Sequence, residues 1–173
     1  MSQQKNSATG TFTGKSDVFL RIQTRRAGLI KGESVDPKHL DEIQVSSWHW
    51  GLSSPTAIGT THATGRRSYT GLTINKFIDA STTALMSVLA TNDEVKEAKL
   101  AVRKSGGTQE DYFIITLNAA RVISVTHGVD AAGMAAETVV INFTKVAVEY
   151  RLQGQAGGLA AATSFNDDIG TPT

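Results

Sequence analysis

Apolar and polar residues alternate along much of this chain, and a period of two is typical of β-strands. The longest example runs from Tyr112 to His127. Residues i and i+2 of a strand point to the same side of a sheet. The apolar residues that share one face here are Phe113, Ile115, Leu117, Ala119, Ile123 and Val125. The pattern therefore predicts a mainly β fold in which this stretch is one long strand, bent near Asn118.

Two further stretches change the phase of their alternation partway along. One runs from Ile43 to Leu52 and the other from Thr138 to Leu152. Such a change within one strand is what a β-bulge produces. We place the bulges near Ser46–Ser47 and Thr144–Lys145. Long strands bent by bulges allow a sheet to curl over itself, so the sequence predicts a β-barrel.

The remaining elements are shorter. Strands are predicted at 18–22, 68–77 and 99–104, with a hairpin turn at 105–107. One helix is predicted over 82–91, because Leu85, Val88 and Leu89 form an apolar stripe. Asp79 or Ser81 is the candidate N-terminal cap of this helix.

Composition excludes several classes of site and partner. The 173 residues include no cysteine, which rules out disulfides and thiolate metal sites, and the formal net charge is +1. A near-neutral chain gives no electrostatic reason to expect a nucleic-acid partner. No apolar run reaches the length of roughly 18 residues that a membrane helix needs, and the first residues do not resemble a signal peptide. We expect no membrane insertion, synthesis in the cytoplasm, and secretion only by a route that reads no N-terminal signal.

The size predicts one domain, over residues 17–153. Residues 1–16 are expected to be a flexible extension. Residues 154–173, which are rich in Gly, Ala and Thr, are expected to be a mobile tail.

The residues capable of chemistry form no recognisable catalytic or metal-binding pattern. The four histidines, none of them at metal-ligand spacing, are His39, His49, His62 and His127. Neither a nucleophile elbow nor a phosphate-binding loop is present. The basic pairs Arg25–Arg26 and Arg66–Arg67 are interpreted as solvated charges or interface partners. We expect no enzymatic activity, no metal and no cofactor.

One strand segment has apolar residues on both faces. Tyr112 and Ile114 lie opposite Phe113 and Ile115. One face can line the barrel core, whereas the other needs a cover from the helix or from a neighbouring subunit. The segment favours a self-associating module, although burial within a single subunit stays an alternative.

Four blocks carry a family resemblance. The first block comprises Gly32, Glu33, Ser34, Asp36, His39, Glu42, Ile43, Val45, Ser47, Trp48, Trp50 and Gly51. The later blocks read INKFIDASTTALM, AKLAVRKSGGTQEDYFIITL and INFTKVAVEY. With these blocks in order between Asp17 and Gln153, the chain resembles the haemolysin-coregulated protein (Hcp) family, the tail-tube protein of bacterial type VI secretion systems.

The resemblance implies a barrel of two packed antiparallel sheets with one flanking helix. It also implies six copies in a ring with a wide channel, and rings stacked into a tube. A contractile sheath would expel this tube with its spike, and the baseplate would be a further partner. The implied alternative role is a carrier and chaperone of effector proteins in the channel. A phage tail-tube protein stays a further possibility by architecture alone.

We assign a structural role to the polar, tryptophan and glycine residues of the first block. Candidate assembly surfaces are the long loop 53–65, whose length nothing within one subunit explains, and the stretch 25–30, which resembles an insertion. The candidate residues are Arg25, Arg26, Ser54, Pro55, Thr61, His62 and Arg66.

Overall fold

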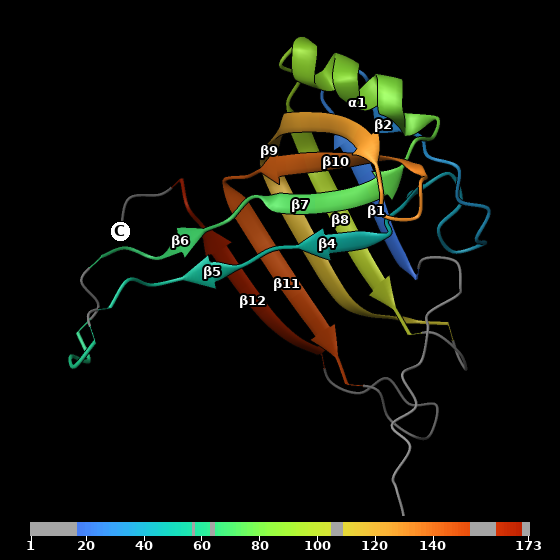
Figure 1. Cartoon of the computed structure of the whole chain (residues 1–173). Coiled ribbons are helices and arrows are strands. Elements are labelled where there is room, and N and C mark those ends of the chain that lie inside the picture. The colour runs from blue at the N-terminus through green and yellow to red at the C-terminus, as the bar shows by residue number, and fades with distance from the viewer. Residues whose placement is uncertain (1–16, 57, 63–64, 105–108, 153–161, 171–173) are drawn as a thin grey trace, which may run out of the picture.

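The computed structural model describes residues 17–56, 58–62, 65–104, 109–152 and 162–170, and these fold into a curved, mainly β body with one helix at its top (Figure 1). The elements are β1 (Val18–Thr24), β2 (Leu29–Ile30), β3 (Ile43–Gln44), β4 (Ser47–His49), β5 (Leu52–Ser53), β6 (Ser68–Tyr69), β7 (Leu72–Phe77), α1 (Ser81–Ala90), β8 (Val95–Arg103), β9 (Asp111–Val129), β10 (Ala135–Asn142), β11 (Lys145–Arg151) and β12 (Ala162–Asp168). The predicted hairpin turn at 105–107 lies outside the described residues.

The strands form two antiparallel layers that share β9. Among the described residues, the main sheet has the order β2-β1-β8-β9-β10-β7-β4, and β11, β12 and β3 branch from it. The first half of β9 pairs with β8 and β11, and its second half pairs with β10. The layers also meet where β3 leads into β4, because Val45 N donates to Val18 O at 3.0 Å and Ser46 N donates to Asn75 O at 2.8 Å. The predicted barrel of two packed sheets with one flanking helix is therefore confirmed.

The two predicted phase changes mark crossings between layers instead of bulges. β3 pairs with β1 in one layer, whereas β4 pairs with β7 in the other. Likewise, β10 pairs with β7, and β11 pairs with the first half of β9. The positions were predicted correctly, but each predicted long strand is divided, since its two halves bond to different layers.

The long strand β9 is continuous and bent, as predicted. The bend lies at Ala119, whose φ is +46°. A second irregularity follows, because Val122 pairs with Ile141 and Ser124 pairs with Val140, so that Ile123 is skipped. The predicted face is therefore wrong at Ile123, which is 48% exposed while Val122 is buried, whereas Val125 packs against the core as predicted.

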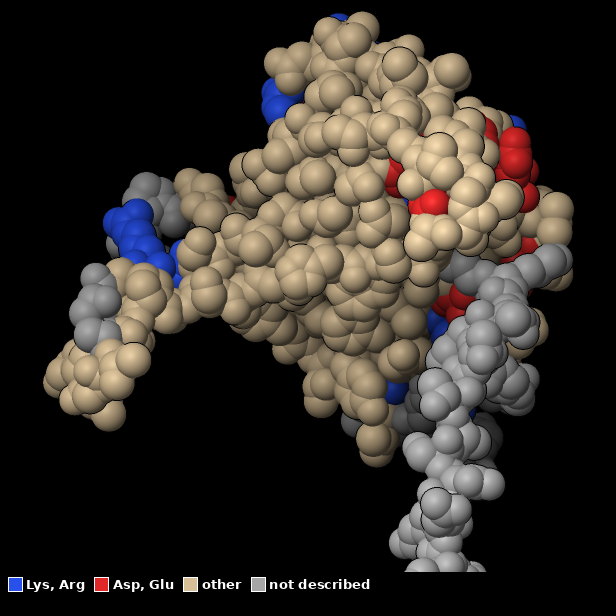
Figure 2. Space-filling view, in the orientation of Figure 1, with Lys and Arg blue, Asp and Glu red and all other residues tan. Residues whose placement is uncertain are grey.

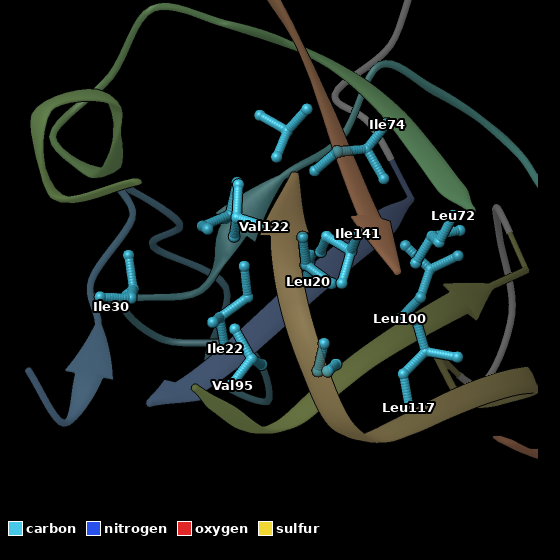
Figure 3. Packing of buried hydrophobic residues seen from close by; sticks show 14 of the residues in the cluster. Leu20, Ile22, Ile30, Leu72, Ile74, Val95, Leu100, Leu117, Val122 and Ile141 are labelled. Carbon is cyan, nitrogen blue, oxygen red and sulfur yellow. The ribbon is translucent and has the colours of Figure 1, made fainter. Parts of the chain in front are cut away.

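The core lies between the two layers and consists almost entirely of aliphatic side chains (Figure 3). Its labelled members are Leu20, Ile22, Ile30, Leu72, Ile74, Val95, Leu100, Leu117, Val122 and Ile141. They come from both layers and point toward one another. Burial of each such side chain contributes about 1.5–3 kcal/mol, so this cluster is the main source of stability.

The helix α1 packs beside β2 and β9, at the top of the body in Figure 1. Leu85 and Val88 are buried, as predicted. The N-cap is Ala80, which makes no side-chain capping bond, so the predicted cap at Asp79 or Ser81 is wrong. Asp79 instead accepts a hydrogen bond from Ser81 N at 2.8 Å, one residue before the cap. The helix ends before Asn92, whose φ of +53° is typical of a helix C-terminus.

The predicted loop 53–65 belongs to a hairpin that extends away from the barrel. Its two short strands, β5 and β6, form a separate two-stranded sheet (Figure 1). We call residues 52–69 the projecting hairpin.

The expected mobile tail is wrong for residues 162–168, because these form β12 and pair along their whole length with β11. The proposed domain limits at residues 16/17 and 153/154 otherwise stay predictions. In the part of the chain that the structure describes, no helix is both long and apolar enough to cross a membrane.

Candidate functional site

Residues 31–42, which we call the motif loop, fold back on themselves beside β1. Gly32 N donates to Asp41 O at 2.7 Å, and Asp41 N donates to Ser34 O at 2.9 Å. A side chain at Gly32 would collide with the backbone of Glu42, because the carbonyl carbon of Glu42 would lie 2.7 Å from an added Cβ. The glycine is therefore required by this close approach of two backbone segments.

His39 is buried at the centre of this loop. Its ring stacks on Phe19 with centroids 4.2 Å apart. Its Nδ1 lies 2.8 Å from Glu42 Oε2, and its Nε2 lies 3.0 Å from Asp111 Oδ1. Because both ring nitrogens face carboxylates, the arrangement suits a protonated imidazole that donates two hydrogen bonds.

Two further polar pairs hold the motif loop in place. Asp36 Oδ2 lies 2.7 Å from Arg103 Nη1, and the guanidinium of Arg103 also lies 5.0 Å from the Phe19 ring centroid. Glu33 Oε1 accepts a hydrogen bond from Ala80 N at 3.1 Å, which connects the loop to the start of α1. These side chains pair with groups of the same subunit, and this arrangement supports the structural role assigned to them.

The surroundings of His39 change its titration. Burial by itself would lower its pKa, but the carboxylates of Glu42 and Asp111 outweigh this effect and raise the pKa above its ordinary value. A group with a raised folded-state pKa contributes stability that is complete below its unfolded pKa of about 6.5. This contribution is lost as the pH rises through the raised pKa.

We predict that H39Q lowers the free energy of unfolding by about 1–3 kcal/mol in mildly acidic solution, since a buried charged hydrogen-bonding group is lost. The difference between wild type and variant should shrink as the pH rises, because the wild-type imidazolium is then lost. Urea unfolding of both proteins between about pH 6 and pH 9 measures this. A difference that grows with pH would contradict the assignment of a protonated His39.

The two tryptophans lie beside the projecting hairpin instead of on one continuous strand. Trp48 in β4 stacks with Phe113 at 5.9 Å between centroids. Trp50 lies just beyond β4 and contacts Tyr69 at 6.0 Å and Phe143 at 6.4 Å. Gly51 follows, and its N donates to Thr70 Oγ1 at 2.9 Å across the base of the hairpin. These residues form an aromatic base from which the hairpin extends.

The projecting hairpin carries five of the candidate assembly residues on exposed positions. They are Ser54, Pro55, Thr61, His62 and Arg66. The basic side chains on this extension, blue at the left of Figure 2, are those of Arg66 and Arg67, because the sequence of the hairpin contains no Lys. From Leu52 to Tyr69 the sequence contains no Asp or Glu. The hairpin is therefore a basic protrusion.

The other two candidates, Arg25 and Arg26, lie in the turn between β1 and β2, beside α1. Arg25 Nε lies 3.2 Å from Glu94 Oε2, and Arg26 N donates to Asp93 Oδ1 at 3.1 Å. These bonds fasten the turn to the end of the helix. The structure does not bring these arginines together with the projecting hairpin.

A row of ionisable side chains, two of them fully buried, was missed by the sequence analysis. Lys76 on β7 lies directly opposite Glu137 on β10, which in turn lies opposite His127 on β9. Both Lys76 and Glu137 have fully buried side chains that form an ion pair. Lys76 Nζ also donates to Asp79 Oδ1 at 2.8 Å, and His127 Nε2 lies 3.0 Å from Glu137 Oε2.

The sequence did contain a signal for this row. Lys76 follows Leu72 and Ile74 at a spacing of two, which places it on the same, core-facing side of the strand. Separately, a search of the described residues finds no group of three His, Asp or Glu side chains arranged to hold a metal ion.

Comparison with known proteins gives a consistent family assignment. Residues 19–150 match the family model described as "Type VI secretion system effector, Hcp". The chain is similar to protein hcp1 of Pseudomonas aeruginosa, with 37% identity over 145 residues, which is 82% of this chain and 86% of that protein.

Solved structures agree. The crystal structure of Hcp1 from Salmonella typhimurium superposes with a TM-score of 0.69 at 25% identity, covering 88% of this chain and 95% of that chain. A type VI secretion system effector from Yersinia pestis gives a TM-score of 0.70 at 23% identity, covering 88% and 100% of the two chains. At this level of identity, the similarity to the Yersinia pestis protein shows a shared fold.

Proposed function

This chain belongs to the Hcp family of type VI secretion tube proteins, and on this premise we propose that six copies close into a ring and that the rings stack into a tube. Function then consists of assembly and expulsion of the tube. The observation that carries the proposal is the projecting hairpin. It leaves the barrel, pairs with itself, and presents side chains that the described part of the same subunit does not cover.

A head-to-tail contact joins two different surfaces of identical subunits. The hairpin supplies one of them, and its basic character defines the chemistry of the other. His62 is exposed near its far end, Arg66 is exposed nearer the barrel, and carboxylates on the adjoining ring would complement them. We therefore assign the hairpin to the contact between stacked rings. Contacts of this kind weaken as salt screens the charges.

The motif loop has a supporting role in the proposal. Its charged residues bond to one another and to the barrel, as in the pairs Asp36–Arg103 and His39–Glu42. It therefore stabilises the part of the barrel formed by β1 and β8. Arg25 and Arg26 likewise bond to Glu94 and Asp93 of the same subunit. The hairpin is therefore a better candidate for the contact between rings than the turn between β1 and β2.

The type VI sheath, spike and baseplate are proposed partners of the assembled tube, and effector proteins are proposed cargo of its channel. The alternative role, in which the ring serves mainly as a carrier of effectors, stays a prediction that no contact in the structure favours over the structural role.

The function is tested in the producing bacterium. We expect the protein in culture supernatants when the contractile sheath is functional, and its retention inside the cells when a sheath gene is deleted. A cytoplasmic marker enzyme controls for lysis. Equal amounts in the two supernatants would contradict export by this machinery.

A further inference from the structure

The direction of the projecting hairpin is not set by strand pairing to the barrel. In the described residues, β5 pairs only with β6, through Leu52–Tyr69 and Ser53–Ser68. The hydrogen bonds at its base, such as that from Thr70 N to Gly51 O at 3.0 Å, join the two arms of the hairpin to each other. The arms of the hairpin continue from β4 and β7, which limits its angle to the barrel, and side-chain contacts between hairpin and barrel restrict the angle further.

One carboxylate makes several of these contacts. Asp167 on β12 accepts two hydrogen bonds from the guanidinium of Arg67, one from Nε and one from Nη2 at 2.7 Å. It also accepts a hydrogen bond from the hydroxyl of Tyr69 at 2.5 Å. The bonds join residues about a hundred positions apart in sequence, at the point where the hairpin leaves the body.

The chemistry of this group favours a fixed geometry. A bidentate arginine–carboxylate pair defines orientation as well as distance. The side chain of Asp167 is 16% exposed and that of Arg67 is 35% exposed, so the pair is partly shielded from water. The hydrogen bonds from Arg67 and then Tyr69 lower the pKa of Asp167 to about 2. The carboxylate thus stays ionised throughout the neutral range.

Tyr69 extends this connection into the aromatic base. Its ring lies 5.7 Å from that of Phe143 at an interplanar angle of 77°, and it also contacts Trp50. The aromatic contacts hold the ring of Tyr69, while Asp167 holds its hydroxyl. Together they resist rotation of the hairpin about its base.

We propose that Asp167 is a positioning residue that fixes the angle of the projecting hairpin, so that the C-terminal strand β12 prepares the subunit for ring stacking. The residue acts through Arg67 and Tyr69 and need not touch the adjoining ring. The consequence for stacking rests on the proposed function. The angle itself does not, and can be measured separately.

Preorganisation explains why the angle matters. A hairpin that pivots must be ordered each time two rings meet, and that cost reduces association even when every contact residue is unchanged. Six hairpins in one ring would be affected together. Loss of the carboxylate should therefore reduce tube formation while leaving the rings intact.

The test measures the hairpin directly in unstacked rings. Because the chain contains no cysteine, spin labels can be placed at I58C on the hairpin and M86C on α1, both at exposed positions. Labelled chains are mixed with a large excess of unlabelled protein, so that only distances within one subunit are recorded. We expect a narrow distance distribution in the otherwise unchanged protein and a broad one with D167N.

The matched control is D168N. Asp168 is the next residue of β12 and lies 3.3 Å from Lys145, away from the hairpin. This change removes the same charge from the same strand, and the distribution should stay narrow. The double variant R67D/D167R, which restores an ion pair with exchanged partners, should narrow the distribution again relative to D167N.

An unchanged narrow distribution in D167N would overturn the proposal, as would equal broadening in D168N. Broadening in D167N with tubes still formed would support the positioning role and count instead against the hairpin as the contact between rings. The inference and the proposed function can therefore fail separately.

Discussion

K76M will lower the free energy of unfolding by about 3–5 kcal/mol, because it removes the buried cationic partner of a fully buried carboxylate. Lys76 and Glu137 both have fully buried side chains, and Lys76 also donates to Asp79. Methionine retains most of the volume of lysine, so the loss comes mainly from charge. Urea unfolding of the two proteins at one subunit concentration measures the difference, since assembly also affects stability.

The double variant K76M/E137L controls for this interpretation. Removing both members of a buried ion pair is often close to neutral. The double variant should therefore be more stable than K76M alone. A loss below about 1 kcal/mol for K76M would contradict the assignment of Lys76 as the necessary partner of a desolvated Glu137.

Shortening the projecting hairpin will abolish tubes while leaving the barrel folded. Replacing residues 54–66 by Asn-Gly keeps β5 and β6 and leaves a three-residue loop, Asn-Gly-Arg67, between the paired residues Ser53 and Ser68, which is a common hairpin length. The removed residues contribute little to the core, which lies between the two layers. Electron microscopy of concentrated protein reports tubes, and circular dichroism reports the fold.

A second variant replaces residues 54–66 by a Gly-Ser segment of equal length. If side chains such as Arg66 make the contact, this variant should also fail to form tubes. Tubes of normal length from the shortened protein would show that the hairpin is not the contact between rings.

The local pattern predicted elements whose residues bury one face. The helix α1 and the bent strand β9 were identified because Leu85, Val88, Ile115 and Leu117 follow helix and strand periods. The phase changes near Ser46 and Thr144 were found as well. The cause of these phase changes, a crossing between layers, was not found. Alternation shows which side of a strand is buried but not which strand lies beside it.

Elements that depend on distant partners escaped prediction. β12 has mostly exposed side chains, so it lacks alternation and exists because β11 supplies its hydrogen bonds. The second irregularity of β9, which exposes Ile123, arises from the register with β10. Lys76 was overlooked because a lysine is usually exposed, although its position in the strand alternation is on the core face.

The candidate site was predicted in part. The motif residues could be given a structural role because no catalytic partners accompanied them, and the bonds of His39 and Asp36 support that assignment. The loop 53–65 was singled out by its length, and its role in assembly stays a prediction. Asp167 was not, since its partner Arg67 lies far away in sequence and only the folded chain brings the two together.

The central claim is that this chain acts as a ring-forming subunit. Size-exclusion chromatography with light scattering tests it most directly. For chains of 18.4 kDa, six subunits predict a particle of about 110 kDa, with larger species as rings stack at higher concentration. A particle of one subunit at every concentration would contradict the account.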